Sequence, residues 1–282
     1  MGGAGAISSK CIFCPNIANS GEHIWPRWMR DLLNRPWDIK RTETTYNYPR
    51  SAAPFGEVIQ GTWNGATHHR KVYVVCESCN NGWMNQEYEI PARKFLEPML
   101  KGDSILLDAA AQEIIARWFA LKVLVIEKDP DAGQPPSPIF TKQSRLTFKR
   151  TGRIPDGFRI WIAARGGELW HSSLALGSGR VGASPEPGAD ASDYTQPGRL
   201  RNVQAATMGA GHLLLHTLAI SWPFLAKRFQ WTVPTEAFQI WPPSGQTVIW
   251  PPDSYLLDWA CEDLSKQFSE FAKSTPRHPP KR

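Results

Sequence analysis

Four of the five cysteines in this 282-residue chain form two pairs, each with two residues between its partners. The first pair is Cys11 and Cys14, in CIFC, and the second is Cys76 and Cys79, in CESC. A two-residue spacer lets both thiolates of a pair bind one tetrahedral Zn²⁺, and two such pairs complete a closed Cys₄ structural site. We therefore expect structural zinc to join the two pairs, with the long segment between them looping out and returning.

Two other uses of the cysteine pairs are disulfide bonds and a redox motif. Disulfides belong to exported proteins, and the N-terminal MGGAGAISSK lacks the charged and apolar regions of a signal peptide. A redox motif needs one pair ahead of a helix and not two matched pairs. The fifth cysteine, Cys261, falls on the apolar face of a predicted helix, where we expect it to be buried. No apolar run is long enough for a membrane span, so we expect a cytoplasmic protein.

The chain carries a net charge of +6 and has a pI near 9.1. This charge is compatible with a polyanionic partner such as nucleic acid, but it does not identify one. Part of the excess lies in the C-terminal KSTPRHPPKR, which contains four basic residues and no acidic residue. We predict that residues 276–282 form a basic disordered tail.

Polar residues that suit catalysis follow each cysteine pair. Glu22 and His23 stand together in SGEHIWPRWM, and the amide-rich CNNGWMNQEYE begins at Cys79. The sequence RKVYVVC predicts a strand that leads into Cys76. A helix is predicted to follow, with a bend near Pro91. Zinc binding would therefore bring a carboxylate, an imidazole and several amides close together.

Three segments in particular, CIFC, GEHIWPRWM and VCESCNNGWMN, resemble the HNH endonucleases, also called ββα-metal or His-Me finger nucleases. The likeness is to their zinc-containing CxxC…CxxC branch of bacterial and phage type, and it is specific over residues 11–89. The resemblance implies that His23 is the general base and that Glu22 is an acidic metal ligand. It matches Asn80 to the last letter of the motif, with Asn81 as the competing candidate. The middle Asn of the motif, which braces the loop in the family, is replaced by Lys71.

The resemblance also implies the chemistry. His23, neutral near pH 7, would activate water. Glu22 and the carbonyl oxygen of Asn80 would hold catalytic Mg²⁺ or Mn²⁺. DNA is the expected substrate, because the family mostly cuts DNA. Basic residues near the site are candidates for binding nucleic acid, although a solvated surface is the competing interpretation: Arg27, His68, His69, Arg70 and Lys71. The segment 34–66 between the two cysteine pairs either lines the path of the substrate or forms a solvated charged loop.

The remainder of the chain predicts an α+β domain with an antiparallel sheet. Residues 108–127 have the apolar periodicity of a helix, with Asp108 as its N-cap. Strands are predicted over 145–150, 158–165, 168–176 and 204–222, with two short strands within 237–252. His212 and His216 are four residues apart, and satisfied core or hairpin histidines are favoured over metal ligands there.

We therefore expect an α+β protein with three parts. A zinc-stabilised ββα-metal (HNH) nuclease domain would occupy residues 1–100, and an α+β domain would occupy residues 101–275, ahead of the tail. The second domain would position substrate or bind a protein partner. Two alternatives stay open. The chain could be the nuclease subunit of a multi-protein bacterial or phage-defence complex that is active only with its partner. It could instead be a catalytically lapsed, zinc-dependent nucleic-acid-binding module.

Overall fold

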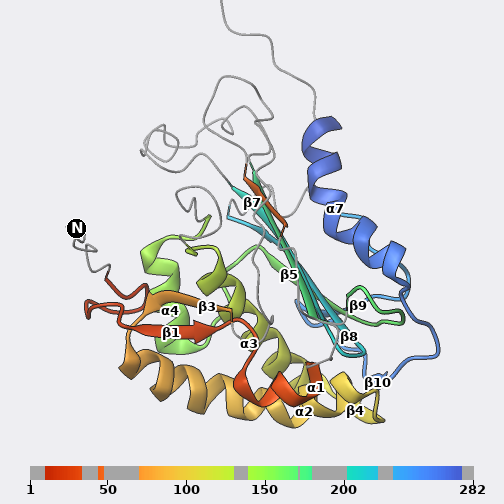
Figure 1. The fold of residues 1–282 in the computed structure, drawn as a ribbon, viewed down its shortest axis with the longest axis horizontal. Coiled ribbons are helices and arrows are strands. Elements are labelled where there is room, and N and C mark those ends of the chain that lie inside the picture. Colours follow the sequence, from red (N-terminus) through yellow and green to blue (C-terminus); the bar gives the residue numbers. More distant parts are fainter. Residues whose placement is uncertain are drawn as a thin grey trace, which may run out of the picture.

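A six-stranded sheet with helices on both sides forms the largest part of this computed structural model (Figure 1). The structure describes residues 10–33, 44–47, 70–129, 139–170, 172–179, 202–221 and 231–274. In order across the sheet, the strands are β2 (Thr44–Asn47), β6 (Ser172–Gly179), β7 (Val203–Ala210), β8 (Leu213–Ile220), β5 (Phe158–Ala164) and β9 (Phe238–Trp241). β2 and β6 are parallel, and all other neighbours are antiparallel.

Both faces of this sheet are buried. The helices α2 (Ile90–Lys101), α3 (Ala109–Ile126) and α4 (Lys142–Thr151) lie on one side, and α7 (Asp258–Ser274) lies on the other (Figure 1). Successive side chains of a strand point to opposite faces. Accordingly, Ile162 and Leu215 join the core on the α3 side, while Ala163 and Leu214 join the cluster that contains Cys261. Two covered faces explain why β7 and β8 are apolar almost throughout, although antiparallel strands usually alternate.

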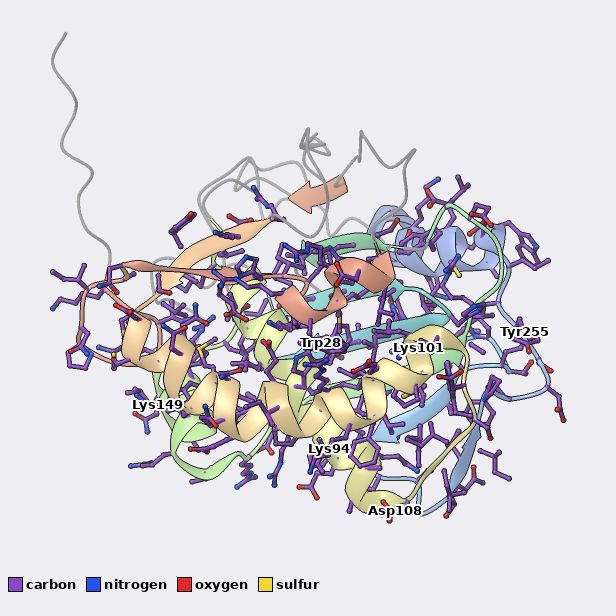
Figure 2. All side chains as sticks on the ribbon, turned by 60° about the horizontal axis from the view of Figure 1, so that its bottom comes forward. Trp28, Lys94, Lys101, Asp108, Lys149 and Tyr255 are labelled. Carbon is purple, nitrogen blue, oxygen red and sulfur yellow. The ribbon has the colours of Figure 1, made fainter. Side chains whose placement is uncertain are left out.

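Helix α3 is the central element on its side of the sheet. Its predicted N-cap is confirmed, since Oδ1 of Asp108 accepts a hydrogen bond of 2.8 Å from the backbone N–H of Ala111. Figure 2 labels Asp108 at this end of the helix. Most side chains of α3 are buried on every side of the helix, as expected for an element enclosed by others. Within the described residues, no helix combines the length and the apolar character that crossing a membrane requires.

Three predicted strands differ from the structure, and the one over 168–176 is displaced along the chain to β6, Ser172–Gly179. Residues 145–150 belong to α4 and not to a strand, because Thr141 caps the start of this helix by accepting a hydrogen bond from the Ser144 N–H. Gly152 ends it with a φ of 69° and donates to the Phe148 carbonyl. The predicted single strand over 204–222 is a hairpin of β7 and β8. Its turn is at Gly211, whose φ of 53° suits glycine.

A smaller two-stranded ribbon lies beside α3 (Figure 1). Its strands β1 (Ser20–His23) and β3 (Lys71–Val75) are antiparallel. Two short helices, η1 (Arg27–Met29) and α1 (Arg30–Leu33), follow β1. The irregular helical segment η3 (Cys79–Glu89) follows β3 and continues into α2. The backbone leaves helical geometry at Gly82, whereas Pro91 lies in the first turn of α2, where proline is tolerated.

The segment 237–252 contributes two strands, as predicted, but they belong to different sheets. β9 joins the large sheet, and β10 (Val248–Trp250) pairs with β4 (Ile105–Leu107). The prediction that Cys261 is buried in the final helix is confirmed.

One hydrophobic core crosses the predicted domain boundary near residue 100. Phe13 and Leu96 on one side of it belong to the same buried cluster as Phe119 and Ile160 on the other. The parallel pairing of β2 with β6 also joins the two parts. The described residues therefore form a mixed α+β structure with mainly antiparallel sheets and a cysteine cluster, and the division into domains remains a prediction. The tail 276–282 lies outside the described residues.

Candidate active site and metal centre

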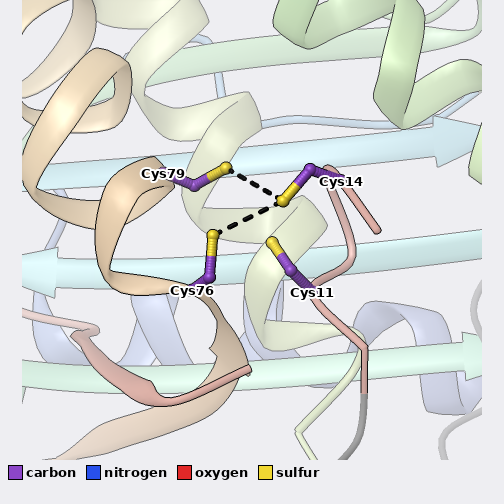
Figure 3. A group of neighbouring side chains, drawn as sticks. All are labelled: Cys11, Cys14, Cys76 and Cys79. Carbon is purple, nitrogen blue, oxygen red and sulfur yellow. Dashed lines mark hydrogen bonds between the residues drawn. The ribbon is translucent and has the colours of Figure 1, made fainter. Parts of the chain in front are cut away.

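The four paired cysteines meet at one point (Figure 3). Their sulfur atoms all lie within 4.8 Å of one another, and none forms a disulfide. Sγ of Cys14 is 3.4 Å from Sγ of Cys76 and 3.7 Å from Sγ of Cys79. Tetrahedral zinc with Zn–S bonds of about 2.3 Å places its sulfurs about 3.8 Å apart. The cluster therefore fits a metal ion such as Zn²⁺.

Backbone hydrogen bonds shape the two turns that present these sulfurs. The Cys11 N–H donates to the Asn16 carbonyl at 2.7 Å and closes the first turn. The N–H groups of Cys79 and Asn80 both donate to the Cys76 carbonyl and start η3. Burial raises the pKa of the Cys11 thiol to about 12. Because zinc binds thiolates, the ion itself would supply the charge that keeps this sulfur deprotonated.

Side chains other than cysteine can also hold a metal ion. Among the described residues, the cysteine cluster is the only group of three or more His, Cys, Asp or Glu side chains arranged to hold one ion.

Glu22 and His23 occupy the end of β1, opposite β3. In the register of this ribbon, Glu22 pairs with Val72 and His23 with Lys71. The Glu22 side chain is buried, and its Oε1 atom forms an ion pair with Lys122 of α3. His23 is partly exposed. The predicted metal ligand Glu22 and the predicted base His23 thus lie on one strand, but the Glu22 carboxylate faces into the protein towards α3.

Lys122 joins three oxygen acceptors inside the protein. Besides Glu22, its ammonium contacts the backbone carbonyl of His23 at 2.9 Å and Oε2 of Glu89 at 3.7 Å. Lys122 is only 1% exposed. Burial raises the pKa of Glu89, and the Glu22 carboxylate adds to this effect while Lys122 opposes it. A buried cation between two carboxylates therefore adjoins the predicted base.

Asn80 and Asn81 have different surroundings. Nδ2 of Asn80 donates to the Ser20 hydroxyl at 2.9 Å and to the Gly21 carbonyl at 3.4 Å. Asn80 thereby braces β1 one residue ahead of Glu22, and its carbonyl oxygen is the side-chain atom that can bind a cation. Asn81 is exposed. Of the two predicted ligands, Asn80 lies against the strand that carries Glu22 and His23.

The three predicted nucleic-acid-binding residues that the structure describes differ in their exposure. Arg27 is exposed and Lys71 is partly exposed, as surface contacts require. Arg70 is buried in an ion pair with Asp129, and its contact with nucleic acid stays a prediction. His68 and His69 lie outside the described residues, as does the segment 34–66 except for β2.

Glu89 and Lys122 adjoin the candidate site, and the sequence patterns did not single them out. Lys122 had one usable signal, since it interrupts the apolar run FALKVLV of an otherwise buried helix. A lysine at such a position is expected to have a partner. No local pattern identifies that partner, Glu22, because it lies 100 residues away in the chain.

His216 is a satisfied core histidine, and His212 is exposed at the hairpin turn. Nε2 of His216 accepts a hydrogen bond of 3.1 Å from the Trp231 indole N–H. Its Nδ1 lies 2.9 Å from the Thr207 hydroxyl. Because indole can only donate, Nε2 carries no proton and Nδ1–H is the donor to Thr207. This arrangement confirms the interpretation of these histidines as core and hairpin residues.

The His216 environment predicts acid sensitivity. Burial lowers the pKa of His216 from 6.5 to about 3. Between these values the unfolded chain binds a proton that the folded chain does not, so stability present above pH 6.5 is lost as the pH falls. We expect this residue to lower the free energy of unfolding by about 2 kcal/mol between pH 7 and pH 5. Urea unfolding at both pH values should show a drop smaller by that amount in His216→Gln. In His212→Gln the wild-type drop should persist, and an unchanged drop in His216→Gln would contradict the prediction.

Comparisons with protein-family models, curated proteins and solved structures find no match to this chain.

Proposed function

We propose that this protein is a metal-dependent endonuclease of the HNH type that hydrolyses phosphodiester bonds in DNA. The observation that carries the proposal is the order of elements around the cysteine cluster. A strand that ends in Glu22-His23 pairs with a second strand, which leads through Cys76 and Cys79 into a helix. This order is that of the ββα-metal nucleases that the sequence resembles.

The proposed roles are those that the resemblance implies for these residues. His23, partly exposed at the end of β1, takes a proton from the attacking water. Glu22 and the carbonyl oxygen of Asn80 would hold Mg²⁺ or Mn²⁺, since these ions prefer oxygen ligands. Such an ion, when bound, stabilises charge on the phosphate and on the leaving oxygen. Lys122 holds the Glu22 carboxylate in place, while Arg27 and Lys71 are available to phosphates.

The first test is nicking of supercoiled plasmid DNA by the purified chain with Mg²⁺ or Mn²⁺. We expect His23→Ala to lower the nicking rate by at least about 100-fold, because general-base catalysis contributes about 10²–10⁴-fold. The matched control is His212→Ala, which removes an exposed histidine remote in sequence from the site and should nick like the wild type.

Zinc content is measured in each preparation, so that loss of the fold is not mistaken for loss of the base. Equal nicking by the wild type and His23→Ala would show that His23 is not the base. No nicking by the wild type, with DNA still bound, would favour a lapsed binding module.

A second candidate function is that of a nuclease subunit controlled by a protein partner. Large apolar side chains at the surface favour it. Leu106 and Ile249, paired across β4 and β10, are 60% and 68% exposed, and Trp259 at the start of α7 is 67% exposed. Contiguous apolar surface is typical of sites that bind other proteins, and Leu106 and Ile249 lie side by side. Nicking that starts only when a partner protein is added would support this candidate.

A further inference from the structure

Lys149 approaches the cysteine cluster from α4, an element that belongs to neither cysteine pair. Its ammonium Nζ is 3.3 Å from Sγ of Cys79. The same Nζ lies 5.9 Å from the centre of the Trp83 ring, which favours a cation at that place. Figure 2 labels Lys149, which is partly buried. A lysine from the second half of the chain therefore contacts a predicted zinc ligand.

The charge of the cluster explains why a cation suits this position. Four thiolates around one Zn²⁺ leave a net charge of about −2. Cys11, Cys76 and Cys79 are buried, so water provides little compensation for that charge. Neutral groups contact two of the sulfurs: the Phe13 N–H lies 3.4 Å from Cys11, and the Ser78 hydroxyl lies 3.2 Å from Cys76. Lys149 adds a full positive charge at Cys79.

We propose that Lys149 is a positioning residue of the zinc site. It donates a charge-assisted hydrogen bond to the Cys79 thiolate, which offsets part of the negative charge of the cluster and slows the loss of zinc. Through this bond α4 is held against the start of η3. This role of Lys149 concerns zinc binding alone, so it does not depend on whether the protein is a nuclease.

The test is the rate of zinc release from the purified full chain to a chelating dye at neutral pH. We expect Lys149→Met to release zinc about 10-fold faster than the wild type, since groups hydrogen-bonded to metal ligands affect affinity by about 10–100-fold. The matched control is Arg150→Met. Arg150 is the next residue of α4 and is exposed, so the control removes the same charge without touching a sulfur, and its release rate should equal that of the wild type.

Lys149→Arg keeps a cationic donor and should restore slow release at least in part. If Lys149→Met does not fold, Lys149→Gln replaces it, with the same direction of effect expected. The proposal is overturned if the neutral Lys149 variants release zinc no faster than Arg150→Met. It is also overturned if Lys149→Arg releases zinc as fast as they do, or if the wild-type chain purifies without zinc.

Discussion

Cys76→Ser is expected to abolish zinc binding and to lower the free energy of unfolding by about 4 kcal/mol or more. A ligand present at about a thousand times its dissociation constant stabilises a fold by about 4 kcal/mol, and structural zinc often binds more tightly. In this chain the ion would link the turn that contains Cys11 and Cys14 to the end of β3 through its bonds to the cysteine sulfurs. Because the hydrophobic core extends far beyond that point, we expect β1 and η3 to loosen first, while the large sheet persists.

Zinc content, thermal unfolding and amide hydrogen exchange measure these effects together. A loss of about 4 kcal/mol corresponds to a fall in Tm of about 10 °C for a chain of this size. Exchange should increase in β1 and η3 and should stay slow in β8. Cys261→Ser is the control, since Cys261 is buried in α7 outside the cluster and its loss should leave one zinc per chain. Unchanged zinc content in Cys76→Ser would contradict the assignment of the metal ligands.

Local patterns predicted the parts of the fold that depend on neighbouring residues. The spacing within each cysteine pair indicated one metal site, and the four sulfurs do meet. The periodicity after Asp108 indicated helix α3, and its N-cap is present. The helix signal lies within a few residues of the structure that it predicts, whereas the metal site is recognised because two pairs with the same spacing occur in one chain.

One unrecognised local cap and two contacts between distant segments account for what the sequence did not show. Residues 145–150 alternate enough to suggest a strand, but the Thr141 cap and the burial of Phe148 select a helix. The sequence alone suggests that Arg70 is a surface cation, whereas the structure pairs its guanidinium with the Asp129 carboxylate. Glu22 was matched to a metal ligand of the family by its position next to His23. Its ion pair with Lys122 could not be predicted in this way, because it depends on how α3 packs against the ribbon of β1 and β3.

Lys122→Met is expected to lower the free energy of unfolding by about 3–5 kcal/mol at pH 7. Removing one partner of a buried ion pair leaves the other charge without compensation, and this costs about that amount. Here two carboxylates lose their shared cation, because both Glu22 and Glu89 contact Lys122. The hydrogen bond to the His23 carbonyl is lost as well. Urea unfolding monitored by circular dichroism measures the change, and Lys94→Met, at an exposed position of α2, should change stability by less than about 0.5 kcal/mol.

A double variant separates the effect of charge from the effect of packing. If the cost of Lys122→Met comes from uncompensated carboxylates, adding Glu22→Gln should recover part of the stability, because a buried pair replaced as a whole is often tolerated. Loss of packing alone would make the two substitutions additive, and additivity would show that the Lys122–Glu22 ion pair contributes little. Zinc content should stay unchanged in each variant, since Lys122 contacts Glu22, Glu89 and His23 and not the cysteines. Nicking activity should fall in Lys122→Met if the placement of Glu22 and His23 on β1 depends on this buried cation.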